Sequence, residues 1–567
     1  MEQLLNKKYG GVAFVLLIVL INCIAAAWHF RIDLTAEKRY TISRPVKQML
    51  RNLDGTVTIT VFLSGEMPAG FKKLANSTQE LLQEFKEYGR TNIKFNFAKP
   101  GDGMDEEART AFLDSLGRLG LRPMNVKAQA KEGEGQEERY VYPGALINYK
   151  DNVTAVDLLQ GQSAVNGINS LNNAEALLEY KFAHSIHKLT REKVPLIGYL
   201  AGNGQPVSYN IYSLVENAIK PNYEFRILPL DSVTIIPPIF DAIMIVKPTV
   251  PFTEAQKLRI DQYIMHGGKV IWMIDNLYAE MDSLQRSQSE FIAFDRGLRL
   301  EDMLFKYGAR INLDLVQGLN ADKFGMVVGD MGGKPQMEMI PWPYFPLLQN
   351  TNGHPIAKNL DYITTQFPHS VDTVKSAGVR KTVLLSTSGE SRILNTPAKV
   401  MLQSIKTEED MKAFSGRDVP VALLLEGRFS SLYANRIPAA VKDSMSAIGY
   451  PFLPADTADN KMIVIADGDI VLNAVSQNEG PLLMGQNMFS KYVYANQEFI
   501  VNCLEYLTDN SGILETRSKD YTLRLLDKSK VEEHKTLWQA INIMAPILLV
   551  IIFGISYQVI RKKKFSK

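Results

Sequence analysis

The residues best suited to bind a ligand follow two predicted strands. Gly202, Asn203 and Gly204 come directly after the apolar run 194–200, and Asp275 ends a later apolar run. Ligands of open α/β sheets bind in the crevice outside the carboxyl ends of the strands, so these four residues are candidates for a ligand site. A tight strand–helix turn is the alternative explanation of the glycines, because glycine adopts the backbone conformations that such turns need.

Two further patterns lack the full residue set that their chemistry requires. His184 and His187 lie three apart on a predicted helix, but no third metal ligand follows at helical spacing. Residues 467–469 (Asp-Gly-Asp) resemble the start of a calcium loop but lack its later oxygen ligands, which favours a turn between strands. We therefore predict structural histidines and no metal site.

Motifs for nucleotide and nucleophile chemistry are missing from the sequence. It contains no GxxxxGK[ST] phosphate loop, no GxSxG nucleophile elbow and no third glycine at dinucleotide-binding spacing after Gly202 and Gly204. The sequence therefore predicts a protein that is not an enzyme and that uses no cofactor.

The elements around the candidate residues predict a doubly wound α/β sheet. Buried parallel strands read as nearly continuous apolar runs, and Thr253 with Gln256 forms a capping box that starts a helix between two such runs. Later strand-like runs could complete the same sheet after a long insertion. The predicted strands are 194–200, 225–228, 242–246, 269–275, 382–386, 419–425 and 462–466, and a final helix covers 497–507.

The segment before this unit predicts a smaller α/β domain. Strand-like runs at 57–63 and 93–97 flank an amphipathic helix at 71–88, and a hairpin follows at 144–158. This β-α-β start with a later hairpin suits a thioredoxin-like domain, although redox cysteines are absent. Within the insertion, the proline-rich stretch 341–346 predicts an extended loop rather than a central strand.

Apolar stretches at both ends are long enough to cross a bilayer. Residues 10–28 and 540–560 each supply roughly 20 residues, which span about 30 Å of hydrocarbon. For the first stretch, a cleaved signal peptide with an Ala25-Ala26-Ala27 site is the alternative.

The flanking residues predict the orientation of these spans. Cytoplasmic flanks are rich in Lys and Arg, and Trp prefers the membrane interface. The predicted interface residues are Trp28, Trp538, Arg561, Lys562, Lys563 and Lys564. The basic tail predicts a cytoplasmic C-terminus, and two spans then place the N-terminus on the same side.

Composition excludes two classes of protein. A net charge of +2, from 63 basic and 61 acidic residues, gives no basic face for nucleic acid. The two cysteines, Cys23 and Cys503, cannot supply a disulfide framework.

Several segments resemble a known family. The stretch 33–43 (DLTAEKRYTIS), with 505–509, 514–519 and 523–528, is similar to the gliding-motility ABC transporter auxiliary proteins of the GldG type. The unit from Val194 to Asp275 resembles a domain that these proteins share with an intraflagellar transport component, which is similar in fold to class I glutamine amidotransferases.

The resemblance implies a function and partners. It implies a non-catalytic, extracytoplasmic auxiliary or substrate-binding subunit at the inner membrane of Bacteroidota, working with a permease and a separate ATPase. A glycan or peptide is the implied ligand, and no catalytic residue carries over because the amidotransferase cysteine is missing. A structural scaffold that couples the permease to envelope machinery without a ligand is the alternative.

Small residues in the spans predict where the permease packs. Helices in lipid associate through small residues, and Gly10, Gly11, Ala545 and Gly554 offer them. The expected organisation is a transmembrane helix (10–29), an N-terminal α/β domain (30–165), a connecting helix (166–192), an amidotransferase-like domain with a long insertion (193–510), a juxtamembrane linker (511–537), a second transmembrane helix (538–560) and a basic tail (561–567).

Overall fold

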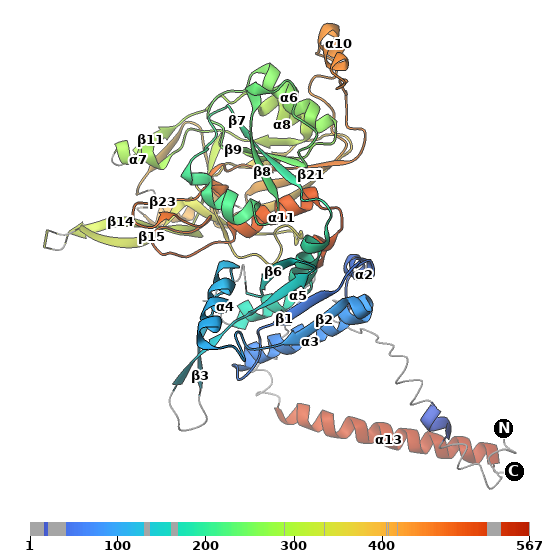
Figure 1. Ribbon diagram of the computed structural model, residues 1–567. Coiled ribbons are helices and arrows are strands. Elements are labelled where there is room, and N and C mark those ends of the chain that lie inside the picture. The colour runs from blue at the N-terminus through green and yellow to red at the C-terminus, as the bar shows by residue number, and fades with distance from the viewer. Residues whose placement is uncertain are drawn as a thin grey trace. The chain divides into compact units, whose positions relative to one another are not determined.

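The computed structural model describes residues 16–20, 41–129, 136–159, 168–287, 290–330, 332–333, 335–403, 405, 407–414, 416, 418–518 and 535–565. The chain divides into two compact units, Met1–Lys519 and Asp520–Lys567. The first contains all the sheets and the second contains one long helix (Figure 1).

The first unit begins with a four-stranded sheet in the order β2-β1-β5-β6. β1 and β2 are parallel, and β5 and β6 form an antiparallel hairpin on the other side of β1. α3 and α5 pack against each other and against this sheet. The elements are α2 (Arg44–Arg51), β1 (Val57–Val61), α3 (Ala69–Gly89), β2 (Ile93–Phe97), α4 (Glu106–Arg118), β3 (Met124–Gln129), β4 (Gln136–Val141), β5 (Gly144–Tyr149), β6 (Asn152–Asp157) and α5 (Ile168–Thr190). The β-α-β start with a later hairpin is therefore present, and the thioredoxin-like assignment stays a prediction.

A seven-stranded sheet forms the centre of the first unit, in the order β18-β21-β22-β10-β9-β7-β8. The five strands from β22 to β8 are parallel to one another. β21 runs antiparallel to β22, and β18 runs antiparallel to β21. Its strands are β7 (Leu196–Ala201), β8 (Glu224–Pro229), β9 (Ala242–Val246), β10 (Val270–Met273), β18 (Val379–Ser386), β21 (Pro420–Gly427) and β22 (Asn460–Ile465). Almost every residue of β7, β9, β10 and β22 is buried, as both covered faces of a parallel sheet require.

The winding of this sheet reverses between β7 and β9. The chain runs from β7 outward to β8 and then builds β9, β10 and β22 on the other side of β7. This is the 2-1-3-4-5 order of a doubly wound sheet, whose ligand site lies at the reversal. The covering helices are η3 (Tyr209–Ile211), η4 (Leu214–Ile219), α6 (Glu254–Met265), α8 (Glu301–Tyr307) and α11 (Asn496–Thr508), with α11 on the opposite side of the sheet from α6 and α8 (Figure 1). The predicted Thr253–Gln256 capping box starts α6.

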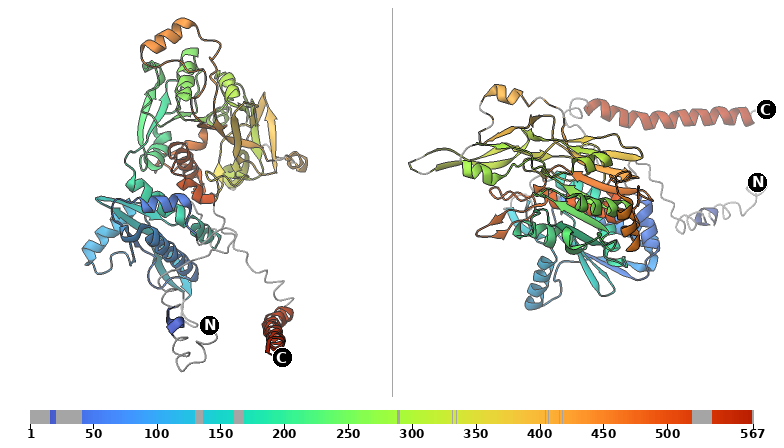
Figure 2. Two further views of the ribbon diagram at one scale, coloured as in Figure 1. Left: turned by 90° about the vertical axis from the view of Figure 1, so that its right-hand side faces the viewer. Right: turned by 90° about the horizontal axis from the view of Figure 1, so that it is seen from above.

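A long insertion separates β10 from β21 and β22. Its helices and strands are α7 (Met281–Ser287), β11 (Glu290–Ala293), β12 (Ala309–Ile311), β13 (Asp314–Gly318), β14 (Ala321–Asp330), β15 (Pro335–Leu348), β16 (Ile363–Thr364), β17 (Val371–Thr373), β19 (Ser391–Asn395), β20 (Ala398–Met401) and α9 (Glu408–Lys412). α10 (Ala439–Ala447) lies between β21 and β22, and η6 (Asp469–Val471), β23 (Val475–Ser476) and β24 (Gly480–Pro481) follow β22. The β14–β15 hairpin projects from the rest of the unit (Figures 1 and 2).

The proline-rich stretch 341–346 belongs to β15, so its prediction as a loop was wrong. The pairing with β14 jumps from Lys323–Pro341 to Ala321–Pro346, which leaves Pro343 without a partner residue on β14, as suits a residue that cannot donate to the ladder. Trp342 and Tyr344 point to one side and are buried in a second core cluster.

α5 is fixed to the C-terminal part of the first unit by both predicted histidines. His184 Nδ1 lies 3.0 Å from Glu505 of α11, and His187 Nε2 lies 3.5 Å from Asp509. The short helix η7 (Ile513–Ser518), inside the expected linker 511–537, also packs on α5. These pairs give the histidines a structural role.

Replacing Asp509 should weaken this contact in a pH-dependent way. Burial alone would raise the pKa of Asp509, but hydrogen bonds from His187 and Ser511 lower it to about 2 from its ordinary 3.8. A lowered folded-state pKa stabilises the fold above pH 4, and the contribution is lost as the pH falls from 4 to 2. Asp509→Asn should therefore cost about 2 kcal/mol at pH 7 and nothing near pH 2, measured by chemical denaturation. Asp459→Asn, an exposed control, should have no effect at either pH.

The second unit contains α13 (Lys535–Phe565). Among the described residues, one helix is long and apolar enough to cross a membrane, at Lys535–Lys564. Trp538 and Tyr557 lie 19 positions apart, which is about 28 Å along a helix and close to the hydrocarbon thickness. Of the predicted first span only residues 16–20 are described, as helix, and Gly10, Gly11 and Trp28 lie outside the described residues.

Candidate functional site

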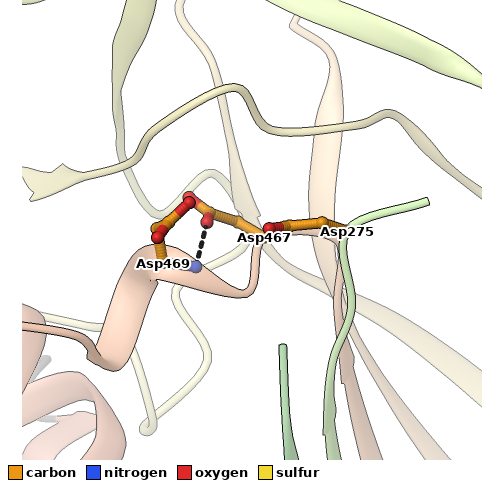
Figure 3. A group of neighbouring side chains, drawn as sticks. All are labelled: Asp275, Asp467 and Asp469. Carbon is orange, nitrogen blue, oxygen red and sulfur yellow. Dashed lines mark hydrogen bonds between the residues drawn. The ribbon is translucent and has the colours of Figure 1, made fainter. Parts of the chain in front are cut away.

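Three aspartates meet at the carboxyl edge of the central sheet. Asp275 follows β10, and Asp467 and Asp469 lie on the turn after β22 (Figure 3). Their carboxylate oxygens lie within 4.8 Å of one another. Backbone groups hold them in place: Gly468 N donates to Asp275 at 2.5 Å, and Asp469 N donates to Asp467 at 2.7 Å. Because β10 and β22 are parallel neighbours, their ends bring these residues together.

Lys247 supplies the positive charge of this cluster. It follows β9, and its Nζ lies 2.6 Å from Asp469, 3.0 Å from Glu280 and 3.5 Å from Asp275. Its backbone has a φ of 42°, in the left-handed region that non-glycine residues rarely occupy. A side chain at position 468 would come within 2.7 Å of Lys247 Cβ, so the turn after β22 needs Gly468. The ammonium occupies the place that a cation bound by these aspartates would take.

The charged groups of the cluster shift one another's pKa values. Burial alone would lower the pKa of Lys247, but Asp469, Asp275 and Glu280 outweigh it and raise the pKa. Burial raises the pKa of Asp467, and the charges of Asp275 and Asp469 raise it further. The arrangement therefore favours the charged form of Lys247 and the neutral form of Asp467.

An open pocket of about 640 Å³ adjoins this network. Glu280 belongs to both, since it binds Lys247 and lines the pocket. The other lining residues are Thr249, Tyr278, Asp282, Arg286, Phe294, Asp295 and Arg296. The lining thus combines aromatic rings with both signs of charge, a composition that can both stack on a ligand and bind its polar groups.

Two exposed aromatic rings form a shelf in this pocket. Tyr278 and Phe294 stack with centroids 5.4 Å apart and planes 16° apart, and Phe294 is 57% exposed. The Arg296 guanidinium lies 4.9 Å from the Tyr278 ring and bonds to Glu280. We refer to Tyr278, Phe294 and Arg296 as the aromatic shelf.

The local backbone explains why the shelf forms. The segments after β10 and β11 pair as a short antiparallel bridge between Leu277 and Asp295. Tyr278 N donates to Phe294 O at 2.7 Å, and Arg296 N donates to Asn276 O at 2.9 Å. This pairing sets the two rings side by side. Contiguous exposed apolar surface can mark a binding site, and the two rings present such surface.

The predicted glycine turn lies at the reversal between β7 and β9. Gly202 and Gly204 have φ angles of 121° and 76°, and a side chain on Gly204 would come within 2.0 Å of Thr249 Oγ1. Asn203 is buried, and its Nδ2 donates to Gln256 at 3.1 Å. Its carbonyl accepts hydrogen bonds from Thr249 and Val250. These contacts tie the turn to the loop after β9 and connect it to the pocket through Thr249.

The structure therefore brings together some predicted residues and adds others. Asp275 lies in the ionic network, and the Gly202–Gly204 turn contacts one pocket residue. Lys247 and the aromatic shelf were not predicted from the sequence. Lys247 directly follows the apolar strand β9, just as Asp275 follows β10, so the same edge rule could have found it. The shelf left no local signal because its two rings come from segments that pair only in the fold.

Comparison with known families places the chain. The family described as an ABC-type uncharacterized transport system matches residues 194–503, which is more than half of the chain. The chain belongs to this family. Residues 36–148 match a domain of unknown function, DUF7088. In this ABC transport family, the match spans the central sheet, the ionic network and the aromatic shelf.

Other comparisons add less. No curated protein matches the chain. A solved structure described as the mmIFT52 N-terminal domain is 11% identical and covers 55% of this chain and 97% of its own, with a TM-score of 0.29. The amidotransferase-like fold therefore remains a prediction, whereas the mixed α/β architecture with several sheets is established.

Proposed function

We propose that this family member is a non-catalytic, extracytoplasmic auxiliary subunit of an ABC transporter, of the GldG type associated with gliding motility in Bacteroidota. It would hold a glycan or peptide in the pocket beside the aromatic shelf and would depend on a permease and a separate ATPase. The family match supports the association with an ABC transport system. The observation that carries the binding role is the exposed Tyr278–Phe294 pair at the carboxyl edge of a doubly wound sheet.

The pocket chemistry suits polar ligands with flat apolar faces. Sugar rings and peptide side chains stack on aromatic rings, while their hydroxyl and amide groups bond to carboxylates and guanidinium groups. The pocket offers Glu280, Asp282, Asp295 and Arg286 for such bonds. The ion-paired cluster of Lys247, Asp275 and Asp469 adjoins this pocket through Glu280.

Ligand-dependent stabilisation tests this proposal. A screen of envelope glycans and peptides should find a ligand that stabilises the full-length protein by about 2.7 kcal/mol at a hundredfold excess over its Kd. Phe294→Ala should weaken the binding of that ligand by about tenfold, because stacking contributes roughly 1 kcal/mol beyond area burial. Phe305→Ala removes a similarly exposed ring on α8, outside the pocket, and should leave the affinity unchanged.

A scaffold without a ligand is the second candidate. It is favoured by the pairing of Lys247 with Asp275, Glu280 and Asp469, because this pairing engages the ammonium within the protein rather than with a ligand. A scaffold would give no stabilisation with any compound in the screen. Unchanged ligand affinity in Phe294→Ala would likewise remove the shelf from the proposal.

The proposed topology is two-pass, with both termini in the cytoplasm and the sheets in the periplasm of the inner membrane. α13 and the basic residues Arg561, Lys562, Lys563 and Lys564 support the C-terminal half of this arrangement. A reporter that is active only in the cytoplasm should give a signal when fused after Lys567. A silent fusion, with a periplasmic reporter active at the same position, would overturn the orientation.

A further inference from the structure

A second polar cavity lies between α5 and the C-terminal part of the first unit. Its volume is about 660 Å³, and its walls come from the end of α4, β6, α5, η4, α11 and η7. It is separate from the pocket of the aromatic shelf, because the two share no lining residue. Five of its lining residues have amide side chains: Asn217, Asn222, Asn359, Gln497 and Asn502.

Two cations are held on the inner wall of this cavity. Lys181 Nζ donates to the carbonyls of Asp157 at 3.0 Å and Leu158 at 2.8 Å. Arg517 is 4% exposed, and its guanidinium lies 4.8 Å from the Tyr180 ring. Arg517 Nη2 donates to the Lys358 carbonyl at 3.2 Å, whereas its Nε has no hydrogen-bond partner among the described residues. A buried guanidinium N–H without a partner is costly unless another group accepts it.

Electrostatics indicate that these cations affect each other. Burial lowers the pKa of Lys181 to about 8, Asp157 opposes that shift, and the charge of Arg517 adds to it. Lys188 also lines the cavity, and burial lowers its pKa. Burial raises the pKa of Glu498, against the attraction of Lys181 and Arg517. The charges of Lys181 and Arg517 therefore act on each other, with Asp157 and Glu498 as carboxylates of the same cavity.

We infer that this cavity is a binding site for a small oxyanion, a phosphate or a carboxylate group held between Lys181 and Arg517. Its oxygens would accept the unpartnered Nε–H of Arg517, and its charge would relieve the repulsion between the two cations. The lining amides would bind the remaining polar groups of the ligand. Because α5 and η7 supply the two cations, a bound anion would join the helix of the N-terminal sheet to the C-terminal segment.

Substitutions that are expected to change the anion affinity in opposite directions test the inference. Calorimetric titration of the full-length protein in detergent with phosphate, and separately with succinate, at constant ionic strength, should show saturable binding of at least one probe. Arg517→Gln should weaken that binding by on the order of tenfold. Glu498→Gln removes the competing carboxylate and should strengthen it several-fold. Arg428→Gln, an exposed arginine outside the cavity, should change nothing.

The outcomes separate this site from the aromatic shelf. Phe294→Ala should leave anion binding intact, so that failure of one site does not imply failure of the other. The phosphate and succinate arms identify which oxyanion is preferred. The inference is wrong if neither probe binds, or if binding is the same in Glu498→Gln and in the unaltered protein. A loss in Arg517→Gln alone, with no gain in Glu498→Gln, would indicate a purely structural arginine and also overturn it.

Discussion

Replacing Lys247 by methionine is expected to destabilise the first unit by about 3–5 kcal/mol. The side chain is 6% exposed, and its ammonium lies within 3.5 Å of Asp275, Glu280 and Asp469. Methionine has a similar length but no charge, so Asp275 and Asp469 would stay buried without their cation, the arrangement that makes broken buried ion pairs costly. Chemical denaturation followed by the fluorescence of the buried Trp272 and Trp342 measures the loss.

A second substitution distinguishes lost charge from lost packing. Adding Asp469→Asn to Lys247→Met removes one uncompensated carboxylate and should recover part of the stability. The single variant should also become more stable as the pH falls towards 4, since protonation removes the same charge. Lys220→Met breaks only an exposed pair with Glu216 and should change the stability by less than about 0.5 kcal/mol. If both lysine variants behave alike, the network does not hold the sheet edge together.

If the proposed permease packs on α13, exchanging the apolar part of this helix for an unrelated apolar helix is expected to release that permease during detergent purification. Nothing lies within 4 Å of a Cβ at Gly554, so this position can accept the close approach of another helix. Trp538 and the basic tail 561–564 would be kept, so that the exchanged helix still inserts. Co-purification of the permease with the tagged protein measures the effect.

A point substitution sharpens this test. Gly554→Leu should weaken co-purification, whereas Ile552→Leu, two positions away on the same helix, should not. The rest of the protein should unfold as before in both variants, because α13 belongs to a separate compact unit. If a chain limited to residues 30–537 captures the permease equally well, α13 is only an anchor and this part of the proposal fails.

The sequence by itself determined the local elements. Apolar runs and a capping box predicted β7, β9, β10, β22 and the start of α6, because both covered faces of a parallel strand and the first turn of a helix leave local patterns. The strands predicted after the insertion do complete the central sheet. The apolar C-terminal stretch predicted α13 by length and composition alone.

Only the tertiary structure decided which side chains meet. Lys247 and Asp469 are 222 positions apart, and they pair because β9, β10 and β22 are neighbours that end at one edge. Strand order carries no local signal, so the ionic network could not be predicted from Asp275 alone. The aromatic shelf likewise depends on a bridge between Leu277 and Asp295. The stretch 341–346 was misassigned for the same reason, because its pairing with β14 and the register jump at Pro343 depend on the partner strand.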